Sequence, residues 1–175
     1  DAQGAKWTEA FAEHAPLPVL LDADGLTHVA RRGIETLKGA SGPRILTPHP
    51  GEAGRLLGVS SAEVQADRYA AASQLAERSG QTVVLKGART LVGTEGLLRV
   101  CAEGTPALGV AGTGDVLSGT VGALAMQAPP AAAAIAGVLL HALAGTAAAR
   151  ADRGLVASDI LCALPEVIGR FAPVS

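Results

Sequence analysis

The stretch from Gly109 to Leu124 limits the folds open to this chain more than any other feature. It contains the small residues and single carboxylate of GTGD (112–115), followed by an apolar run without a charged residue or a proline. A helix that is apolar all round has to be buried, because no face of it is well solvated. We therefore expect a tight glycine turn that leads into the first turn of a buried helix.

The start of this helix also predicts an anion site. The free N–H groups of a first helical turn and the positive end of the helix dipole attract anions, and glycine lets a phosphate come close because it has no Cβ. The spacing fits neither a P-loop nor G-x-G-x-x-G. Two interpretations of Asp115 remain open: it caps the helix, as Asp often does, or it acts as a base beside the phosphate.

Composition indicates one domain over residues 1–175, long enough to bury a real core. Only 17% of the residues are charged, so the chain is not of the disordered class. A net charge of −2, no Lys/Arg cluster and almost no aromatic residues argue against nucleic-acid binding. Cys101 and Cys162 fit no metal or redox spacing, which favours a reducing compartment, and we expect a cytoplasmic protein.

One segment has the length of a membrane span. Residues 131–149 carry no charge. The segment is mostly Ala and Gly, which insert weakly, has His141 in its middle, and lacks a basic flank or an aromatic belt. We expect a buried helix opened by Pro129-Pro130 and no membrane partner; a transmembrane helix is the lesser alternative.

Strand-like and helix-like segments alternate, which predicts an α/β fold with three layers and a mostly parallel central sheet. The expected strands are Leu17–Leu21, Arg44–Thr47, Thr82–Leu85 and a hairpin of Leu91–Gly93 with Leu97–Cys101. Besides the two apolar helices, the expected helices lie within 1–15, from the turn at 22–25 to about Arg32, over Glu52–Leu57 and Ala62–Ser79, and from a start at Ser158 onward.

Polar residues follow two of the expected strands, at the carboxyl ends where open α/β sheets bind ligands. Asp22 and Asp24 come after the first strand, and we expect Asp24 to cap the next helix. His49 comes after the second strand, between two prolines that fix its backbone, and is a site candidate. Glu52 begins the following helix, where its charge suits the dipole.

Lys86 ends the most buried-looking strand, Thr82–Leu85. Its ammonium points either to a ligand, for which phosphate is the natural partner, or to solvent with its stem lying along apolar surface. Position alone leaves both possibilities open.

Six motifs occur together in one order. They are DADGL (22–26), LTPHPGE (46–52), LKGART (85–90), AGTGDVLSG (111–119), LLH (139–141) and LVASDI (155–160). In this order they resemble the carboxyl part of the ADP- or ATP-dependent NAD(P)H-hydrate dehydratases, a branch of the ribokinase-like fold. Kinases of that superfamily carry an element similar to GTGD, so TPHPGE together with LKGA is what points to the dehydratases.

The resemblance implies a repair reaction in which ADP or ATP phosphorylates the hydroxyl of hydrated NADH or NADPH, and phosphate then leaves. It implies that Asp115 is the base and a substrate contact and that His49 contacts the hydrated dinucleotide. It also implies that Glu52 organises Mg²⁺ through water, although the related kinases carry Asn three residues before this glutamate, where this chain has His. The residues that it implies for the nucleotide are Lys86, Gly87, Ala88, Arg89, Thr90, Gly112, Thr113 and Gly114.

Members of this family are longer at the amino end, so we expect the amino-terminal part of the domain to be absent from this chain. The strand Leu17–Leu21 should then lie at the open side of the sheet. Resemblance further implies a homo-oligomer, often a tetramer, and a fused or partner epimerase for the same hydrate. Two alternatives remain: a ribokinase-like kinase for a vitamin-precursor alcohol, and a catalytically silent nucleotide-binding fragment.

Overall fold

The computed structural model describes residues 2–151 and 154–171. Helices and strands alternate as the sequence predicts, and 3-10 turns over 34–39 and 106–108 are additions to the expected elements. The strands are β1 (Val19–Leu21), β2 (Arg44–Leu46), β3 (Thr82–Leu85), β4 (Leu91–Thr94) and β5 (Leu97–Val100). The helices are α1 (Ala2–His14), α2 (Ala23–Arg32), α3 (Pro50–Leu57), α4 (Ser61–Ala66), α5 (Arg68–Ser79), α6 (Thr113–Ala125), α7 (Pro130–Ala148) and α8 (Ala157–Gly169), with 3-10 turns η1 (Ile34–Gly39) and η2 (Pro106–Leu108).

The five strands form one sheet in the order β1-β2-β3-β4-β5. Strands β1, β2 and β3 are parallel, with Leu20 opposite Ile45 and Ile45 opposite Thr82. The predicted hairpin adds β4 and β5 in antiparallel orientation. Among the described residues β1 pairs only with β2, so the first strand lies at an edge of the sheet, as expected.

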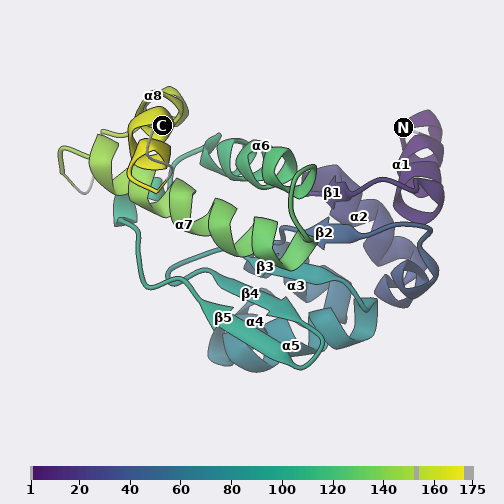
Figure 1. The fold of residues 1–175 in the computed structure, drawn as a ribbon. Coiled ribbons are helices and arrows are strands. Elements are labelled where there is room, and N and C mark those ends of the chain that lie inside the picture. Colours follow the sequence, from purple (N-terminus) through teal and green to yellow (C-terminus); the bar gives the residue numbers. More distant parts are fainter. Residues whose placement is uncertain (1, 152–153, 172–175) are drawn as a thin grey trace.

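Helices cover both faces of this sheet (Figure 1). Leu46 and Val83 pack with α2, η1, α3, α4 and α5 in one core, whereas their neighbours Ile45 and Val84 pack with α6 and α7 in another. The alternation follows from the two-residue period of a strand. A third cluster joins α8 to α7 and to η2. The predicted three-layer α/β fold is confirmed.

Capping side chains move three predicted helix boundaries. Asp22, not Asp24, caps α2 and accepts from the N–H of Ala23 at 2.9 Å. The single helix predicted over 62–79 is wrong, because Asp67 ends α4 and its Oδ1 accepts from the N–H of Ala70 in the next helix. Ser158 does not start α8: the helix begins one residue earlier, where Asp159 accepts from the N–H of Val156 at 3.0 Å. A carboxylate near a chain reversal competes for backbone N–H groups and so selects the boundary.

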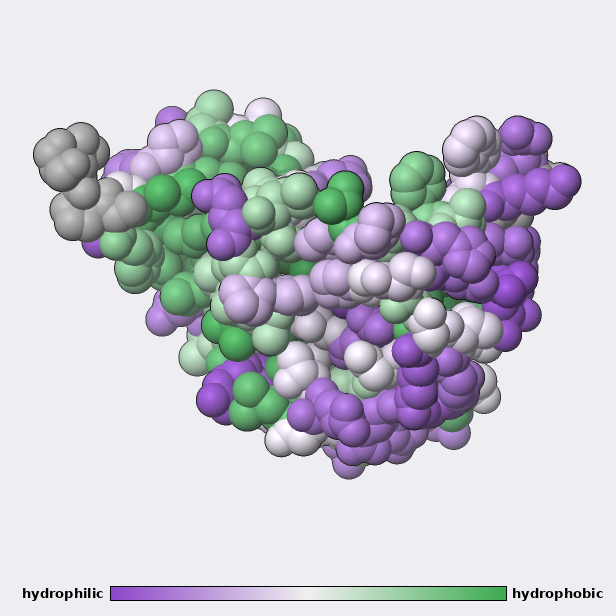
Figure 2. All heavy atoms as spheres, turned by 45° about the vertical axis from the view of Figure 1, so that its right-hand side comes forward, coloured by the Kyte–Doolittle hydropathy of each residue, from purple (hydrophilic) through white to green (hydrophobic). Residues whose placement is uncertain are grey.

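Helix α7 is long and apolar enough to cross a membrane by length and composition, and about 44% of its span is buried inside the structure. Its buried side packs against the sheet and against α6 and α8. Figure 2 shows hydrophobic side chains gathered over the end of the molecule that carries α7 and α8, while hydrophilic ones cover much of the opposite end. These contacts make α7 a helix that packs into the α/β core on one side, which agrees with the expected core helix.

Candidate functional site

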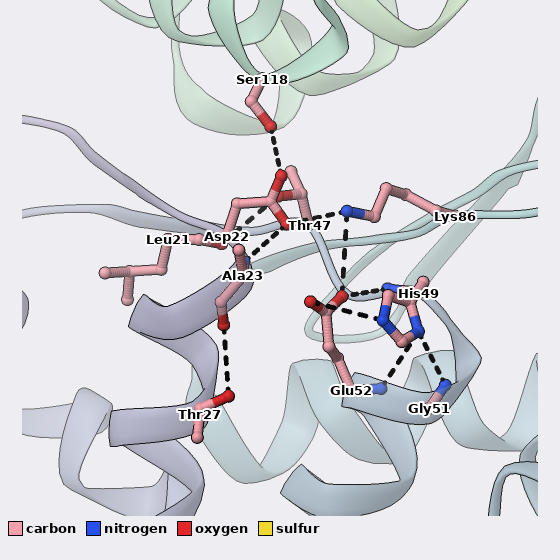
Figure 3. Close-up of polar contacts among 10 residues, drawn as sticks. All are labelled: Leu21, Asp22, Ala23, Thr27, Thr47, His49, Gly51, Glu52, Lys86 and Ser118. Carbon is pink, nitrogen blue, oxygen red and sulfur yellow. Dashed lines mark hydrogen bonds and ion pairs between the residues drawn. The ribbon is translucent and has the colours of Figure 1, made fainter. Parts of the chain in front are cut away.

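The carboxyl ends of three parallel strands meet at one edge of the sheet. Asp22 follows β1, the segment from Thr47 to His49 follows β2, and Lys86 follows β3. Figure 3 shows these side chains converging below Ser118 of α6. Sequence reasoning placed polar groups at these ends, and the parallel pairing is what brings them into contact.

Asp22 is at the centre of this cluster. Its Oδ1 lies 2.8 Å from Lys86 Nζ and also accepts from the N–H of Ala23, and its Oδ2 accepts from Ser118 Oγ at 2.8 Å. Burial alone would raise the pKa of the Asp22 carboxyl, but the hydrogen bonds from Lys86 and Ser118 outweigh burial and hold this pKa below its usual value. Asp22 is therefore an ionised carboxylate that joins β1, β3 and α6.

Glu52 and His49 form the second half of the cluster, at the start of α3. His49 is the N-cap: its Nδ1 accepts from the N–H groups of Gly51 and Glu52 at 3.0 and 3.3 Å. Glu52 Oε2 accepts from the N–H of His49 at 2.7 Å, which completes a capping box. Glu52 is only 5% exposed, whereas 52% of the His49 side chain is exposed. The ring is thus fixed by its own helix and open to a ligand on one side.

Lys86 connects the carboxylates to the start of α6. Its Nζ lies 2.8 Å from Asp22 and 3.8 Å from Glu52 Oε2. On the other side, a Cβ added to Gly114 would lie 3.6 Å from the same nitrogen. The ammonium therefore stands beside the positive end of a helix, an unfavourable arrangement that the two carboxylates offset and that a bound anion would relieve.

Next to Lys86 lies a cavity of about 470 Å³. Such a volume suits a small-molecule ligand. Lys86, Gly87, Ala88, Arg89, Thr90, Thr113 and Gly114 all line it, together with residues 101–106 and parts of α6 and α7. Of the residues predicted for the nucleotide, only Gly112 is not in the lining. Asp115, His49 and Glu52 lie outside the lining.

Asp115 does not cap α6, so the structure excludes the first of its two interpretations. Gly112, with φ +85°, is the N-cap of α6, a conformation that glycine adopts without strain. Asp115 is the third residue of the helix and exposed, and it makes no hydrogen bond or ion pair with any residue that the structure describes. Its carboxylate is therefore free to receive a proton or to contact a ligand.

His141 of α7 contacts the backbone at the start of α6. Its ring is buried on α7, and Nε2 donates to the carbonyl of Thr113 at 2.9 Å. Burial lowers the pKa of His141, partly offset by this bond, so the imidazole is neutral. The sequence marked this residue only as part of a motif, because its partner is 28 positions away.

The donors present suit Mg²⁺ with help from a ligand. Asp22 and Glu52 offer carboxylate oxygens, and Mg²⁺ commonly takes one or two carboxylates while phosphates and waters complete its shell. Within 2–151 and 154–171 no group of three or more His, Cys, Asp or Glu side chains gathers, so these residues form no all-protein metal cage. Lys86 now neutralises both carboxylates.

Sequence reasoning did not propose Asp22 and Ser118 as site residues. An aspartate directly after a strand was the available signal for Asp22. Ser118 carries no such signal, because its role depends on α6 passing over the end of β1, 96 positions away.

Comparisons with known proteins identify relatives of this chain. The profile of the NAD(P)H-hydrate dehydratase family matches residues 2–166. The ADP-dependent (S)-NAD(P)H-hydrate dehydratase of Neisseria meningitidis is 44% identical over 157 residues, which cover 86% of this chain and 53% of that protein. The bifunctional NAD(P)H-hydrate repair enzyme Nnr of Moorella thermoacetica is 41% identical over 156 residues, 87% of this chain and 29% of that protein.

A solved structure extends the likeness to three dimensions. The ADP/ATP-dependent NAD(P)H-hydrate dehydratase of Bacillus subtilis, co-crystallised with ATP and Mg²⁺, matches with a TM-score of 0.80 and 34% identity, over 90% of this chain and 58% of that one. The chain spans about half the length of the two dehydratases and less than a third of the bifunctional protein. With a family profile that covers nearly all of its residues, and with the ribokinase-like fold, the chain belongs to the NAD(P)H-hydrate dehydratase family.

Proposed function

We propose that this chain carries the nucleotide-dependent dehydration of hydrated NADH or NADPH back to NADH or NADPH, a carbon–oxygen lyase reaction driven by ADP or ATP. The single observation that carries the proposal is the position of Lys86. Its ammonium lies between a carboxylate cluster and the start of α6, at the wall of a cavity lined by five consecutive residues of the LKGART motif.

The nucleotide occupies this cavity in our proposal. Lys86 and the segment Gly87–Thr90 bind it, and the N–H groups of Gly112, Thr113 and Gly114 hold the transferring phosphoryl group. Two features support this placement: a cation already stands at the helix start, and the first-turn N–H groups of α6 point out of the helix with no intrahelical partner.

Asp115 then acts as the general base. The hydroxyl oxygen of the hydrated ring attacks the terminal phosphorus, its proton passes to the Asp115 carboxylate, and the bond from phosphorus to the departing nucleotide oxygen breaks. Phosphate next leaves with cleavage of the carbon–oxygen bond, and a proton is lost from the adjacent ring carbon. The exposed and unpartnered carboxylate in the first turn of α6 supports this role.

The carboxylate side of Lys86 receives the dinucleotide and the metal. His49, fixed as the cap of α3 with half of its side chain exposed, contacts the hydrated substrate. Glu52 would hold Mg²⁺ through water, with the Asp22 carboxylate nearby. Bound Mg²⁺ would neutralise charge on the phosphates, while Asp22 keeps Lys86 in place.

For the protein as a whole we propose one ribokinase-like domain over residues 1–175 that assembles into a homo-oligomer, a tetramer by resemblance, in the cytoplasm. The bifunctional relative supports an epimerase for the same hydrate as a fused or separate partner. We propose no nucleic-acid or membrane partner, in keeping with a net charge of −2 and with the packed position of α7.

One assay tests the function. The protein is mixed with hydrated NADPH and either ADP or ATP, and the absorbance of reduced nicotinamide is followed. Recovery of absorbance with one phosphate released per NADPH is the expected result. A stable phosphorylated alcohol as the product would identify a kinase instead. Binding of AMP or ADP without turnover, in a sample for which an active family member serves as control, would reduce the chain to a nucleotide-binding fragment.

A further inference from the structure

Arg68 contacts the proposed nucleotide segment and does not line the cavity. It is the first residue of α5. Its Nη2 donates to the carbonyls of Leu85 and Lys86 at 3.2 and 3.3 Å, and its Nη1 donates to the carbonyl of Ala88. A single guanidinium therefore binds three carbonyls within four consecutive residues.

The carbonyl groups and the N–H groups of this segment differ in whether they are hydrogen-bonded within the protein. The remaining carbonyl, that of Gly87, accepts from Thr90 Oγ1 at 3.0 Å. By contrast, the N–H groups of Gly87, Ala88 and Arg89 donate to no acceptor among the described residues, and these three residues line the cavity. Because the carbonyls are held by side chains, the N–H groups are left as donors for an anionic or polar ligand in the cavity.

The backbone is shaped to admit the guanidinium. Gly87 has φ +137°, and a Cβ at this position would lie 3.0 Å from Arg68 Nη2. Arg89 adopts φ +53°, a conformation that non-glycine residues take only when their surroundings hold them there. Arg68 Nε is buried without an acceptor among the described residues, so the side chain loses one hydrogen bond to place its other donors on this segment.

We propose that Arg68 is a positioning residue for the nucleotide site: by holding the carbonyls of Leu85, Lys86 and Ala88, it presents the N–H groups of residues 87–89 to the phosphates or ribose of the bound nucleotide. The inference rests on the proposed function for the identity of the ligand. The forked, planar guanidinium suits this task, because one ammonium cannot reach three carbonyls in fixed directions.

Arg68→Met and Arg68→Lys test the proposal, with Arg78→Met as the matched control. Arg78 lies in the last turn of the same helix, bonds Glu35 at 2.7 Å and the Leu57 carbonyl at 3.3 Å, and does not touch the segment. Calorimetry measures AMP affinity. Amide hydrogen exchange at Lys86, whose N–H donates to the carbonyl of Pro48 at 2.8 Å, measures the order of the segment in the free proteins. Urea unfolding follows stability in parallel.

We expect Arg68→Met to weaken AMP binding at least tenfold and to speed exchange at the amide of Lys86, Arg68→Lys to fall between it and the wild type, and Arg78→Met to change neither property. Millimolar methylguanidine should restore affinity to Arg68→Ala, whereas ammonium should not. A folded Arg68→Met with unchanged AMP affinity and unchanged exchange would overturn the proposal, as would loss of stability alone. A wild type that binds no AMP would refute the nucleotide assignment instead, and the exchange measurement would still decide the role of Arg68.

Discussion

Arg44 and Lys86 are cations at opposite ends of the strands of one sheet, and they have different roles. We call the side where the parallel strands begin the amino edge and the side where they end the carboxyl edge. Arg44 begins β2 at the amino edge, is 0% exposed, and donates to the carbonyls of Ala12, Ala15, Leu17 and Pro43 at 2.7–3.1 Å. Lys86 follows β3 at the carboxyl edge, with carboxylates on one side and a cavity on the other.

The difference lies in what each cation can exchange. Three of the carbonyl partners of Arg44, those of Ala12, Ala15 and Leu17, belong to the end of α1 and the residues after it, so they cannot be replaced without detaching that helix. Lys86 is bound to side chains and faces a cavity, so an incoming phosphate can take over part of its coordination. We infer that the amino edge of the sheet stabilises the fold and that the carboxyl edge binds and reacts.

The largest expected effect concerns Asp115. Asn keeps its size and its place in the helix but cannot accept the proton, so Asp115→Asn should lower the turnover rate by about 10²–10⁴-fold. Stability should change little, and AMP affinity should hold or rise. Asp24→Asn, another exposed aspartate in a first helical turn, is the control. Steady-state kinetics with hydrated NADPH checks this; near-normal turnover in the variant would remove Asp115 from the mechanism.

Arg44→Met should cost stability and not function. The change removes a donor from four carbonyls, although that of Pro43 still accepts from the N–H of Val19 at 3.0 Å. We expect a loss of about 3–5 kcal/mol in the free energy of unfolding, since buried unsatisfied groups cost about 1–3 kcal/mol each and part of this loss is recovered by relaxation. Urea unfolding measures the loss, with Arg31→Met on the exposed side of α2 as control. Where the variant does not fold, Arg44→Lys serves in its place. Weaker AMP binding at unchanged stability would break the comparison.

Lys86→Ala should weaken nucleotide binding more than it lowers stability. Removing the ammonium takes away a charge-assisted contact, so AMP or ADP should bind more weakly by about 1.5–3 kcal/mol. The two carboxylates then face each other without a cation, which adds a smaller loss of stability. Calorimetry gives the affinity and urea unfolding gives the stability. Full affinity in a folded variant would remove Lys86 from the nucleotide site.

His49→Ala tests whether the dinucleotide and the nucleotide bind on different sides of Lys86. Losing the N-cap should destabilise the protein by about 1 kcal/mol. The Michaelis constant for hydrated NADPH should rise while AMP affinity stays near normal. His14→Ala, an exposed histidine at the end of α1, controls for loss of an imidazole. The opposite pattern, weaker AMP binding with an unchanged Michaelis constant, would place His49 with the nucleotide.

The smallest expected effect is a pH dependence from Asp22. Its folded pKa is below the unfolded value of about 4, so the carboxylate stabilises the fold fully above that pH and loses this contribution as the pH falls further. The difference in unfolding free energy between the wild type and Asp22→Asn, which can still cap α2, should therefore shrink as the pH falls below the unfolded pKa and through the lowered folded pKa. Unfolding curves at several pH values measure it, and a constant difference would show that the lowered pKa is not coupled to folding.

Much of the fold could be predicted because its signals are local. The strand Thr82–Leu85, the hairpin and the two apolar helices were all recognised from short patterns, and they appear close to the expected bounds. The errors fall at boundaries: Asp22 replaces Asp24 as a cap, Asp67 divides a helix, and Ser158 is not a cap. Several polar side chains stood near each boundary, and packing decided which of them reached the N–H groups.

The sequence by itself determined the alternation of strands and helices, the glycine turn before α6, and a lysine at the end of a buried strand, since each depends on neighbours within one or two turns of chain. Only the tertiary structure decided what these residues touch. Parallel pairing brought Asp22 to Lys86 across 64 positions, and the passage of α6 over β1 brought Ser118 to Asp22 across 96. Contacts of this range depend on how strands and helices pack in space, so no local pattern could specify them.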